Sequence, residues 1–287
     1  MILGAHLSIA GGLSLAPARA RAIGGEALQI FSRNQRQWRA RPLGAAQAAG
    51  FCQAVKAAGL RALCTHASYL INLAAPEAGL WQKSIRTLAD ELARAERLGI
   101  AFVVVHPGAH KGRGREAGWQ RVAAAVSEAF DRSATRRVRL LLENTAGQGS
   151  YLGSTLEELA MGLALAGRRV GICLDTCHLF AAGYDFSSAA AYRRLRRRIA
   201  ATVGLSRVQV LHLNDSAKPP GSHLDQHAGI GRGLIGAAAF AFWVNDPAWA
   251  NTPGILETPG GERNYRREVR LLRAMNTAAG TVPAANP

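Results

Sequence analysis

Eight short apolar segments alternate with longer amphipathic segments along almost the whole chain, and this alternation constrains the fold more than any other feature. Several of the apolar segments, including AFVVVH, VRLLLE and VQVLHL, are continuous, which is typical of parallel strands buried on both faces. The clearest helical segment, residues 79–99, ends at a glycine, a common helix stop signal. The expected strands are Ile2–Leu7, Ala27–Phe31, Ala62–His66, Phe102–His106, Arg139–Glu143, Gly171–Asp175, Val208–Leu213 and Gly254–Glu257.

This pattern predicts the α/β class, with a single (β/α)8 TIM barrel over residues 1–278. The length of 287 residues fits one such barrel, which typically needs about 250. Residues 279–287 are mostly small and are predicted to form a flexible C-terminal tail. A doubly wound open sheet is the structural alternative. No G-x-G-x-x-G motif follows the first expected strand, which disfavours that alternative.

The chain carries 35 Lys and Arg against 19 Asp and Glu, a formal net charge of +16. Such an excess suits a polyanionic partner such as nucleic acid. A compositional bias towards Arg, Ala and Gly would also produce it, so charge alone does not decide. None of the four cysteines forms a C-x-x-C pair and we see no signal peptide, which predicts a reduced, cytoplasmic protein. No apolar run is long enough to span a membrane.

Histidines and carboxylates stand at the ends of six consecutive expected strands or in the loops that follow. In a TIM barrel, these positions converge on one face, where catalytic residues lie. Each residue alone is more often a hydrogen-bonded structural histidine or a helix N-cap. Together they would bring buried charges into mutual repulsion unless cations neutralise them. The nine candidates are His66, His106, Glu143, Asp175, His178, His212, Asp225, His227 and Glu257.

Nine candidate ligands are too many for one metal ion. One zinc takes about four ligands, so the set predicts two or three ions. The share of imidazoles favours zinc or another late transition metal over magnesium or calcium. Clustered metals suit in-line displacement at phosphorus, which agrees with the positive charge. We expect no organic cofactor, and we interpret Cys177 as a core residue.

A basic loop, residues 32–41 (SRNQRQWRAR), follows the second expected strand and would rise from the same face. Its four arginines, Arg33, Arg36, Arg39 and Arg41, could grip phosphates, and Trp38 could stack on or insert into a duplex. The alternative is a solvated loop with Trp38 packed against the barrel.

Two further segments are interpreted from their surroundings. Tyr69 and Leu70 follow His66 and would lie at the mouth of the site, either as ligand contacts or as hydrophobic cover. The arginine-rich run at residues 192–198 is interpreted as the solvated face of an outer helix.

Two long motifs, LDTCHLFAAGYD at 174–185 and LHLNDSAKPPGSHLDQHAGIGRGLIG at 211–236, resemble the endonuclease IV family of apurinic/apyrimidinic endonucleases. The resemblance runs from GAHLSIAGGL at 4–13 to ILETPG at 255–260. It implies a TIM barrel acting on duplex DNA in base-excision repair. Such an enzyme hydrolyses the phosphodiester 5′ to an abasic site, leaving a 3′-hydroxyl and a 5′-deoxyribose phosphate. We expect a monomer by default, because bound DNA would need the open top of the barrel.

The resemblance also implies three zinc ions and a role for each candidate. His66, His106 and Glu143 would hold the first ion, and Glu143 would bridge to a second ion. The remaining ligands of the second would be Asp175, His212 and Glu257, and those of the third His178, Asp225 and His227. Glu143 and Glu257 would be the catalytic carboxylates, with Glu257 orienting the nucleophile. Arg36, Tyr69 and Leu70 would enter the gap that a flipped abasic nucleotide leaves.

Two positions depart from the family pattern. Gln226 stands between Asp225 and His227 where an arginine is common, and Ala67 stands where an acidic residue is often found. These departures bear on DNA contact and leave all nine candidate ligands in place. The functional alternatives are a sugar isomerase or epimerase on a similar barrel, which would need fewer ligands and no basic loop, and a non-catalytic DNA-binding barrel, which would be expected to lose ligands.

Overall fold

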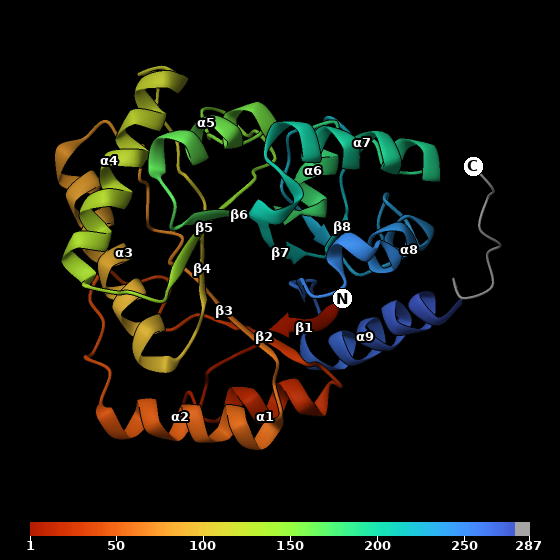
Figure 1. The fold of residues 1–287 in the computed structure, drawn as a ribbon, viewed down its shortest axis with the longest axis horizontal. Coiled ribbons are helices and arrows are strands. Elements are labelled where there is room, and N and C mark those ends of the chain that lie inside the picture. Colours follow the sequence, from red (N-terminus) through yellow and green to blue (C-terminus); the bar gives the residue numbers. More distant parts are fainter. Residues whose placement is uncertain (279–287) are drawn as a thin grey trace.

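The computed structural model describes residues 1–278 and contains a closed barrel of parallel strands in the order β1-β10-β7-β6-β5-β4-β3-β2 (Figure 1). The predicted TIM barrel is therefore confirmed, and the doubly wound open sheet is wrong. The predicted tail, residues 279–287, lies outside the described residues. The barrel strands are β1 (Ile2–His6), β2 (Ala27–Ile30), β3 (Ala62–His66), β4 (Phe102–Val105), β5 (Arg139–Glu143), β6 (Val170–Asp175), β7 (Val208–His212) and β10 (Pro253–Leu256).

Helices cover the outside of the barrel, where their apolar faces pack on the strands (Figure 1). In α3, for example, Ile85, Leu88 and Leu92 are fully buried, and the helix ends at Gly99, whose φ of 67° is the left-handed conformation of a glycine stop. The helices are α1 (Leu15–Ala22), α2 (Ala45–Ala58), α3 (Ala78–Leu98), α4 (Arg115–Ser133), α5 (Leu156–Ala166), α6 (Thr176–Ala181), α7 (Ala189–Thr202), α8 (Ala237–Asn245) and α9 (Gly261–Ala278).

The arginine-rich run lies on α7, as interpreted from the sequence. Arg193 and Arg197 are exposed, and Arg198 forms an ion pair with Glu157 at 3.0 Å. None of the helices within residues 1–278 is long and apolar enough to cross a membrane.

The barrel interior is divided into an apolar layer and a polar layer. The apolar layer consists of one residue from each strand: Ile2, Ala27, Cys64, Val104, Leu141, Cys173, Val210 and Ile255. Because strand side chains alternate between two faces, the second residue after each of these also points inward, one step nearer the carboxyl end. In six strands or their immediate ends that residue is Gln29, His66, His106, Glu143, Asp175 or His212, and after β10 it is Glu257. The strand period itself places the polar layer at the carboxyl end.

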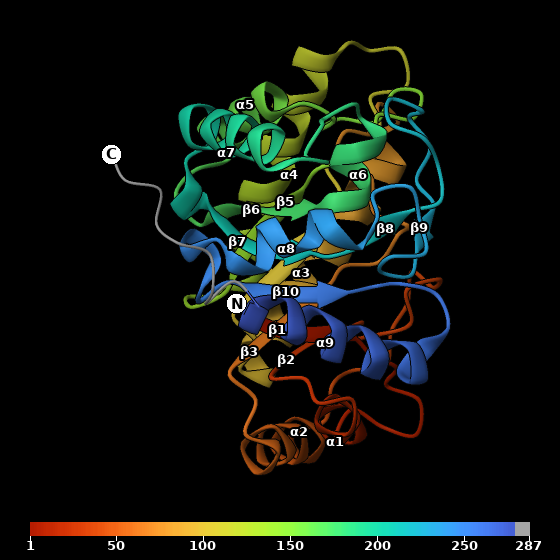
Figure 2. The same cartoon turned by 90° about the vertical axis from the view of Figure 1, so that its right-hand side faces the viewer.

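A small antiparallel hairpin, not expected from the sequence, adds to that end of the barrel. It pairs β8 (Asp215–Ser216) with β9 (His227–Ala228). Figure 2 shows both strands beside the loops at the carboxyl end of the barrel strands. The hairpin turns the segment after β7 back so that Asp225 and His227 approach the polar layer.

Candidate metal centre

The structure brings all nine candidate residues together in three neighbouring groups at the carboxyl end of the barrel. Within each group the potential ligand atoms lie within 4.8 Å of one another. The three groups that consist of candidates alone are His66, His106 and Glu143; then Glu143, Asp175, His212 and Glu257; then His178, Asp225 and His227. Glu143 belongs to two of these three groups, so two of the potential ion positions share a carboxylate. Two further groups add the buried thiols of Cys173 and Cys177, but burial raises the pKa of both thiols and so disfavours the thiolate that binds metal.

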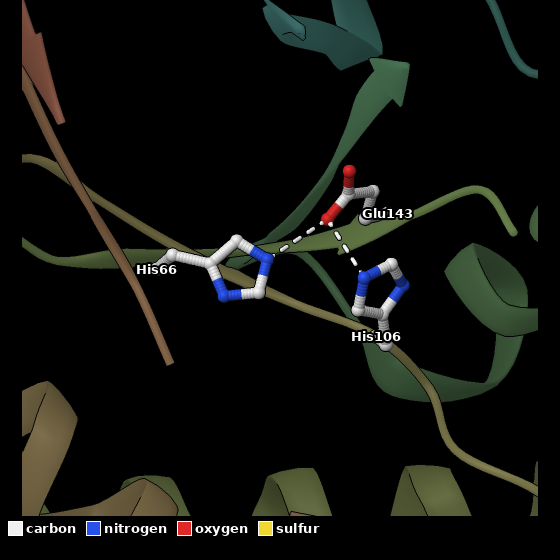
Figure 3. A group of neighbouring side chains, drawn as sticks. All are labelled: His66, His106 and Glu143. Atoms are coloured by element: carbon white, nitrogen blue, oxygen red, sulfur yellow. Dashed lines mark hydrogen bonds and ion pairs between the residues drawn. The ribbon is translucent and has the colours of Figure 1, made fainter. Parts of the chain in front are cut away.

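The first group is shown in Figure 3. Oε2 of Glu143 lies 3.0 Å from Nε2 of His66 and 3.4 Å from Nε2 of His106. The three side chains come from neighbouring strands, β3, β5 and the end of β4, and point towards one another. Glu143 is almost fully buried whereas the side chain of His106 is 24% exposed, so this group opens towards solvent on one side.

The second group is the most deeply buried. Nδ1 of His212 lies 2.8 Å from Oε1 of Glu143, 3.2 Å from Oε2 of Glu257 and 3.9 Å from Oδ2 of Asp175. One imidazole therefore faces three carboxylates, and a single proton on it could neutralise only one of them. Without a cation, neighbouring imidazoles such as His66 and His227 would have to carry protons as well, because a buried carboxylate left without a positive partner costs several kcal/mol.

The third group lies nearest the surface. Oxygens of Asp225 lie 3.1 Å from Nε2 of His178 and 3.3 Å from Nε2 of His227. Nε2 of His227 is also 3.6 Å from Oδ2 of Asp175, which connects this group to the second. The side chain of Asp225 is 40% exposed, so the centre is reached by solvent from this rim.

Three imidazoles are oriented by backbone carbonyl oxygens. Nδ1 of His66 lies 2.7 Å from the carbonyl oxygen of Ala67. Nδ1 of His178 lies 2.9 Å from the carbonyl oxygen of Asn144, and Nδ1 of His227 lies 3.3 Å from that of Glu257. A carbonyl only accepts, so Nδ1 of each ring carries a proton, and Nε2 faces the cluster as the atom that would bind a cation. Nε2 of His178 and Nε2 of His227 are buried and have no hydrogen-bond partner among the described residues.

The carboxylates give the centre a negative electrostatic field. Burial opposes charge on His178, but Asp175, Asp225 and Glu143 outweigh it and raise its pKa to about 10. Burial likewise opposes charge on His227, and Asp175 and Asp225 raise its pKa to about 9. Without a metal, these carboxylates thus draw protons onto the imidazoles. The same field would favour divalent cations in their place.

Two asparagines that sequence reasoning missed hold Asp175. Asn214 donates from Nδ2 to Oδ2 of Asp175 at 2.6 Å, and its Oδ1 accepts from the backbone N–H of Glu257 at 2.8 Å. Asn144 accepts from the backbone N–H of Asp175 at 2.6 Å and donates to its carbonyl at 3.2 Å. Asn144 directly follows a candidate ligand in the sequence and Asn214 lies two positions after another, but their amide chemistry gives no separate signal.

Gln29 and His6 were missed as well, and here a signal existed. Nε2 of Gln29 donates to Oε1 of Glu257 at 2.6 Å, and its Oε1 lies 3.0 Å from Nε2 of His212. Nδ1 of His6 lies 3.0 Å from the same Oε1 of Glu257. Gln29 occupies the inward position after Ala27, the strand position that identifies the ligands on the other strands. Applying the period of two to β2 would have found it.

Of the residues expected to contact DNA, Tyr69 and Leu70 line a pocket beside this centre, and Arg36 lines another hollow together with His6. Tyr69 is 62% exposed, and its ring lies 5.5 Å from that of His66. Leu70 is half-buried and Arg36 is exposed. The pocket beside the centre, of about 220 Å³, is lined by residues that include Tyr69, His106 and Asp225. A larger hollow of about 780 Å³ lies at the opposite, amino end of the barrel and contains none of the nine candidates.

The structure corrects one interpretation of the basic loop and clarifies the two departures. Arg33 is only 6% exposed and points into the protein, so it is not available to grip phosphate. Trp38 is half-buried. Ala67 is 1% exposed, whereas Gln226 is exposed on the segment that carries Asp225. Cys177 is fully buried and burial raises its thiol pKa, in agreement with a core residue.

Comparisons with known proteins agree along nearly the whole chain. Residues 17–275 match the family model described as xylose isomerase-like TIM barrel. A probable endonuclease 4 of Chloroflexus aurantiacus is 46% identical over 276 residues, which cover 95% of this chain and 97% of the relative. A probable endonuclease 4 of Geobacter sulfurreducens is 42% identical over 289 residues, covering 98% of each.

Solved structures point the same way. Endonuclease IV from Thermus thermophilus is similar with a TM-score of 0.87 and 40% identity, covering 97% of this chain and 100% of that one. A D-tagatose 3-epimerase-like protein is similar with a TM-score of 0.72 but only 17% identity, which shows a shared fold alone.

The barrel and its clustered imidazoles and carboxylates define a xylose isomerase-like TIM barrel with a candidate metal centre at its carboxyl end. Within that class, the sequence identity of 42–46% to endonuclease 4 proteins over nearly the whole chain decides the family. The chain belongs to the endonuclease IV family, a family of hydrolytic nucleases, as the sequence motifs indicated.

Proposed function

We propose that this protein is a zinc-dependent apurinic/apyrimidinic endonuclease that hydrolyses the phosphodiester 5′ to abasic sites in duplex DNA. Its products would be a 3′-hydroxyl and a 5′-deoxyribose phosphate. The observation that carries the proposal is the gathering of nine potential ligands into three groups in a chain of the endonuclease IV family. A cytoplasmic location and a monomeric state stay predictions from the sequence.

The donor set fits three zinc ions. It combines imidazole nitrogen with carboxylate oxygen and contains no required thiolate, a mixture that zinc accepts and that magnesium and calcium do not prefer. The buried, unpartnered Nε2 atoms of His178 and His227 each face an oxygen of Asp225, which is the arrangement expected where a cation belongs. Zinc ions bound here would supply charge to neutralise the phosphate and would lower the pKa of water near the scissile bond.

The two proposed catalytic carboxylates are held differently. Glu143 directs Oε2 to His66 and Oε1 to His212, so it would bridge the first and second ion positions. Glu257 has Oε1 held by Gln29 and His6, which leaves Oε2 directed into the centre. In that position Glu257 can accept a hydrogen bond from the attacking water and orient it towards phosphorus.

The DNA side of the proposal rests on the loops around the centre. Arg36 is exposed, and within residues 1–278 its guanidinium forms no ion pair. Tyr69 presents an exposed aromatic ring at the edge of the pocket, with Leu70 beside it. Inserted side chains of these types can replace the stacking that a flipped abasic nucleotide leaves behind.

Nicking of a duplex with one abasic-site analogue tests the proposal. The zinc-loaded protein should cut on the 5′ side of the analogue and spare the intact duplex. His106→Ala and Glu257→Gln should lose nicking while keeping the circular dichroism spectrum of the parent. Full activity in both variants would refute the assigned roles. Elemental analysis well below two zinc ions per chain would refute the trinuclear centre.

The epimerase-like structures provide the alternative outcome. If the zinc-loaded protein converted a ketose or an aldose and did not cleave the abasic duplex, the assignment as a nuclease would be wrong. The protein would then be a sugar isomerase or epimerase.

A further inference from the structure

The loop between β2 and α2, residues 32–41, contains no helix or strand, yet side chains from outside and within the loop hold its backbone. Most backbone carbonyls in an irregular segment lack ladder partners and must find others. Here the partners are two buried arginines and one serine. Ser68, which follows β3, donates from Oγ to the carbonyl of Gln35 at 2.6 Å.

Arg33 holds the middle of the loop. One guanidinium nitrogen donates to the carbonyls of Gln37 at 2.9 Å and Trp38 at 2.7 Å. The other donates to Oδ2 of Asp90 on α3 at 2.7 Å. The side chain of Arg33 is 3% exposed, so its charge is directed inward although it belongs to the most basic loop of the chain.

Arg94, also on α3, holds the two ends of the same loop. It donates to the carbonyl of Ser32 at 3.3 Å and to the carbonyl of Arg41. Its Nε donates to Oδ2 of Asp90 at 2.9 Å, so one carboxylate oxygen of Asp90 serves both arginines. The helix that carries Asp90 and Arg94 lies next to α2 in the outer ring (Figure 1).

We propose that Arg33, Asp90 and Arg94 form a clamp that fixes the 32–41 loop, and with it Arg36, in a shape ready to bind DNA. The part of the proposal that concerns DNA rests on the proposed function. In this view the three are positioning residues that never touch DNA. They lower the conformational entropy that the loop would otherwise lose on binding, and rigid presentation of this kind raises affinity without a new contact.

The geometry distinguishes the clamp from a set of isolated surface ion pairs. Such pairs contribute little to stability in general. Here both guanidinia are buried, and together they bond four loop carbonyls through a planar fork of donors, which a lysine cannot reproduce. The clamp should therefore act on the order of the loop more than on the stability of the barrel.

The first test uses the free protein. Arg33→Ala and Asp90→Asn should speed trypsin cleavage after Arg36 and Arg39, and should raise hydrogen exchange of the loop amides, by about tenfold or more, as loss of local protection predicts. Arg33→Lys should fall between the wild type and Arg33→Ala, because it keeps the ion pair and loses carbonyl bonds. Arg86→Ala, which removes an exposed arginine from the same helix, is the matched control and should change neither. Unchanged cleavage and exchange in Arg33→Ala would overturn the clamp.

The second test uses abasic duplex with the zinc-loaded enzyme. Arg33→Ala and Asp90→Asn should raise KM and Kd about tenfold, while the single-turnover rate at saturating enzyme and the zinc content stay close to wild type. Arg36→Ala should weaken binding without loosening the loop. Unchanged Kd in a variant whose loop exchanges faster would overturn the link between loop order and affinity. A wild type that neither binds nor nicks abasic DNA would refute the proposed function and the DNA half of this proposal, whereas the free-protein test decides the clamp separately.

Discussion

Replacing Glu91 by glutamine is expected to stabilise the protein more at pH 8 than at pH 5. Glu91 lies on α3 and is 1% exposed. Its Oε2 accepts a hydrogen bond from Ser32 Oγ at 2.6 Å, but its Oε1 is buried without a partner among the described residues. Burial is the dominant influence and raises the pKa of Glu91 from 4.5 to about 7, although Ser32 and Arg33 oppose it.

The pH dependence of this effect follows from the pKa of Glu91 in the unfolded chain, 4.5, and its pKa of about 7 in the folded protein. Below pH 4.5 the carboxyl is neutral in both the folded and the unfolded chain, so it carries no ionisation penalty. Between pH 4.5 and about 7 the unfolded chain loses its proton while the folded protein retains it, and the stability of the folded state therefore falls. At about 1.4 kcal/mol for each factor of ten in proton affinity, the penalty is about 1 kcal/mol at pH 5 and about 3 kcal/mol at pH 8. A glutamine cannot ionise and avoids the penalty.

Urea unfolding of the wild type and Glu91→Gln at pH 5 and pH 8, in the same metal-loaded form, measures this difference. The gain in unfolding free energy should be larger at pH 8 by about 2 kcal/mol. Glu96→Gln is the opposing control. Burial raises the pKa of Glu96, but hydrogen bonds from Arg137 and Val138 outweigh it and lower the pKa. That variant should lose stability at pH 8, and the loss should shrink as the pH falls. An equal effect of Glu91→Gln at both pH values would refute the reasoning.

Three other perturbations test the centre and its supports. Asn214→Ala removes the 2.6 Å hydrogen bond to Asp175. It should lower the zinc content, measured by elemental analysis, and should lower the unfolding free energy by about 2 kcal/mol. A zinc content and an unfolding free energy equal to those of the parent would count against the role of Asn214. Gly233→Ala places a Cβ 2.5 Å from Oδ1 of Asp215 and should lower the unfolding free energy by about 1–3 kcal/mol. An unchanged Tm would show that the backbone around Gly233 shifts enough to accommodate the methyl group. Chelation of the metal should lower the Tm, because the carboxylates around His212 then lose their neutralising charge, and a chelator-insensitive Tm would argue against buried ions.

Much of the fold and of the candidate centre follows from strand periodicity. Continuous apolar runs identified the barrel strands because parallel strands in a TIM barrel are buried on both faces. Candidate residues such as His66 and Asp175 could be placed on one face because all eight strands are parallel and their carboxyl ends meet. The strand after the longest helical segment was predicted to end at His106 but ends at Val105, which leaves the site where it was expected.

The misses share a physical cause. Arg33 was interpreted as a phosphate contact because a charge in a basic loop reveals its type but not its direction, and the carboxylate that draws it inward, Asp90, lies 57 positions away. The hairpin of β8 and β9 consists of two-residue strands that carry no periodic signal. Asn144 and Asn214 act through side-chain geometry, which local sequence does not determine.

The interior of the barrel connects its folding to its candidate chemistry. The apolar layer ends at residues such as Leu141 and Val210, and the next inward positions are Glu143 and His212. A barrel of this width must fill its interior with side chains from every strand, so the packing directs the carboxylates of Glu143, Asp175 and Glu257 inward rather than outward to water. Their charge must then be met inside the barrel. Imidazoles can share protons with some of the carboxylates, but Glu143, Asp175 and Glu257 all approach His212, which can neutralise only one of them. Metal ions are the groups that satisfy both the packing and the charge, so ion binding should be coupled to the stability of the carboxyl end of the barrel as well as to catalysis.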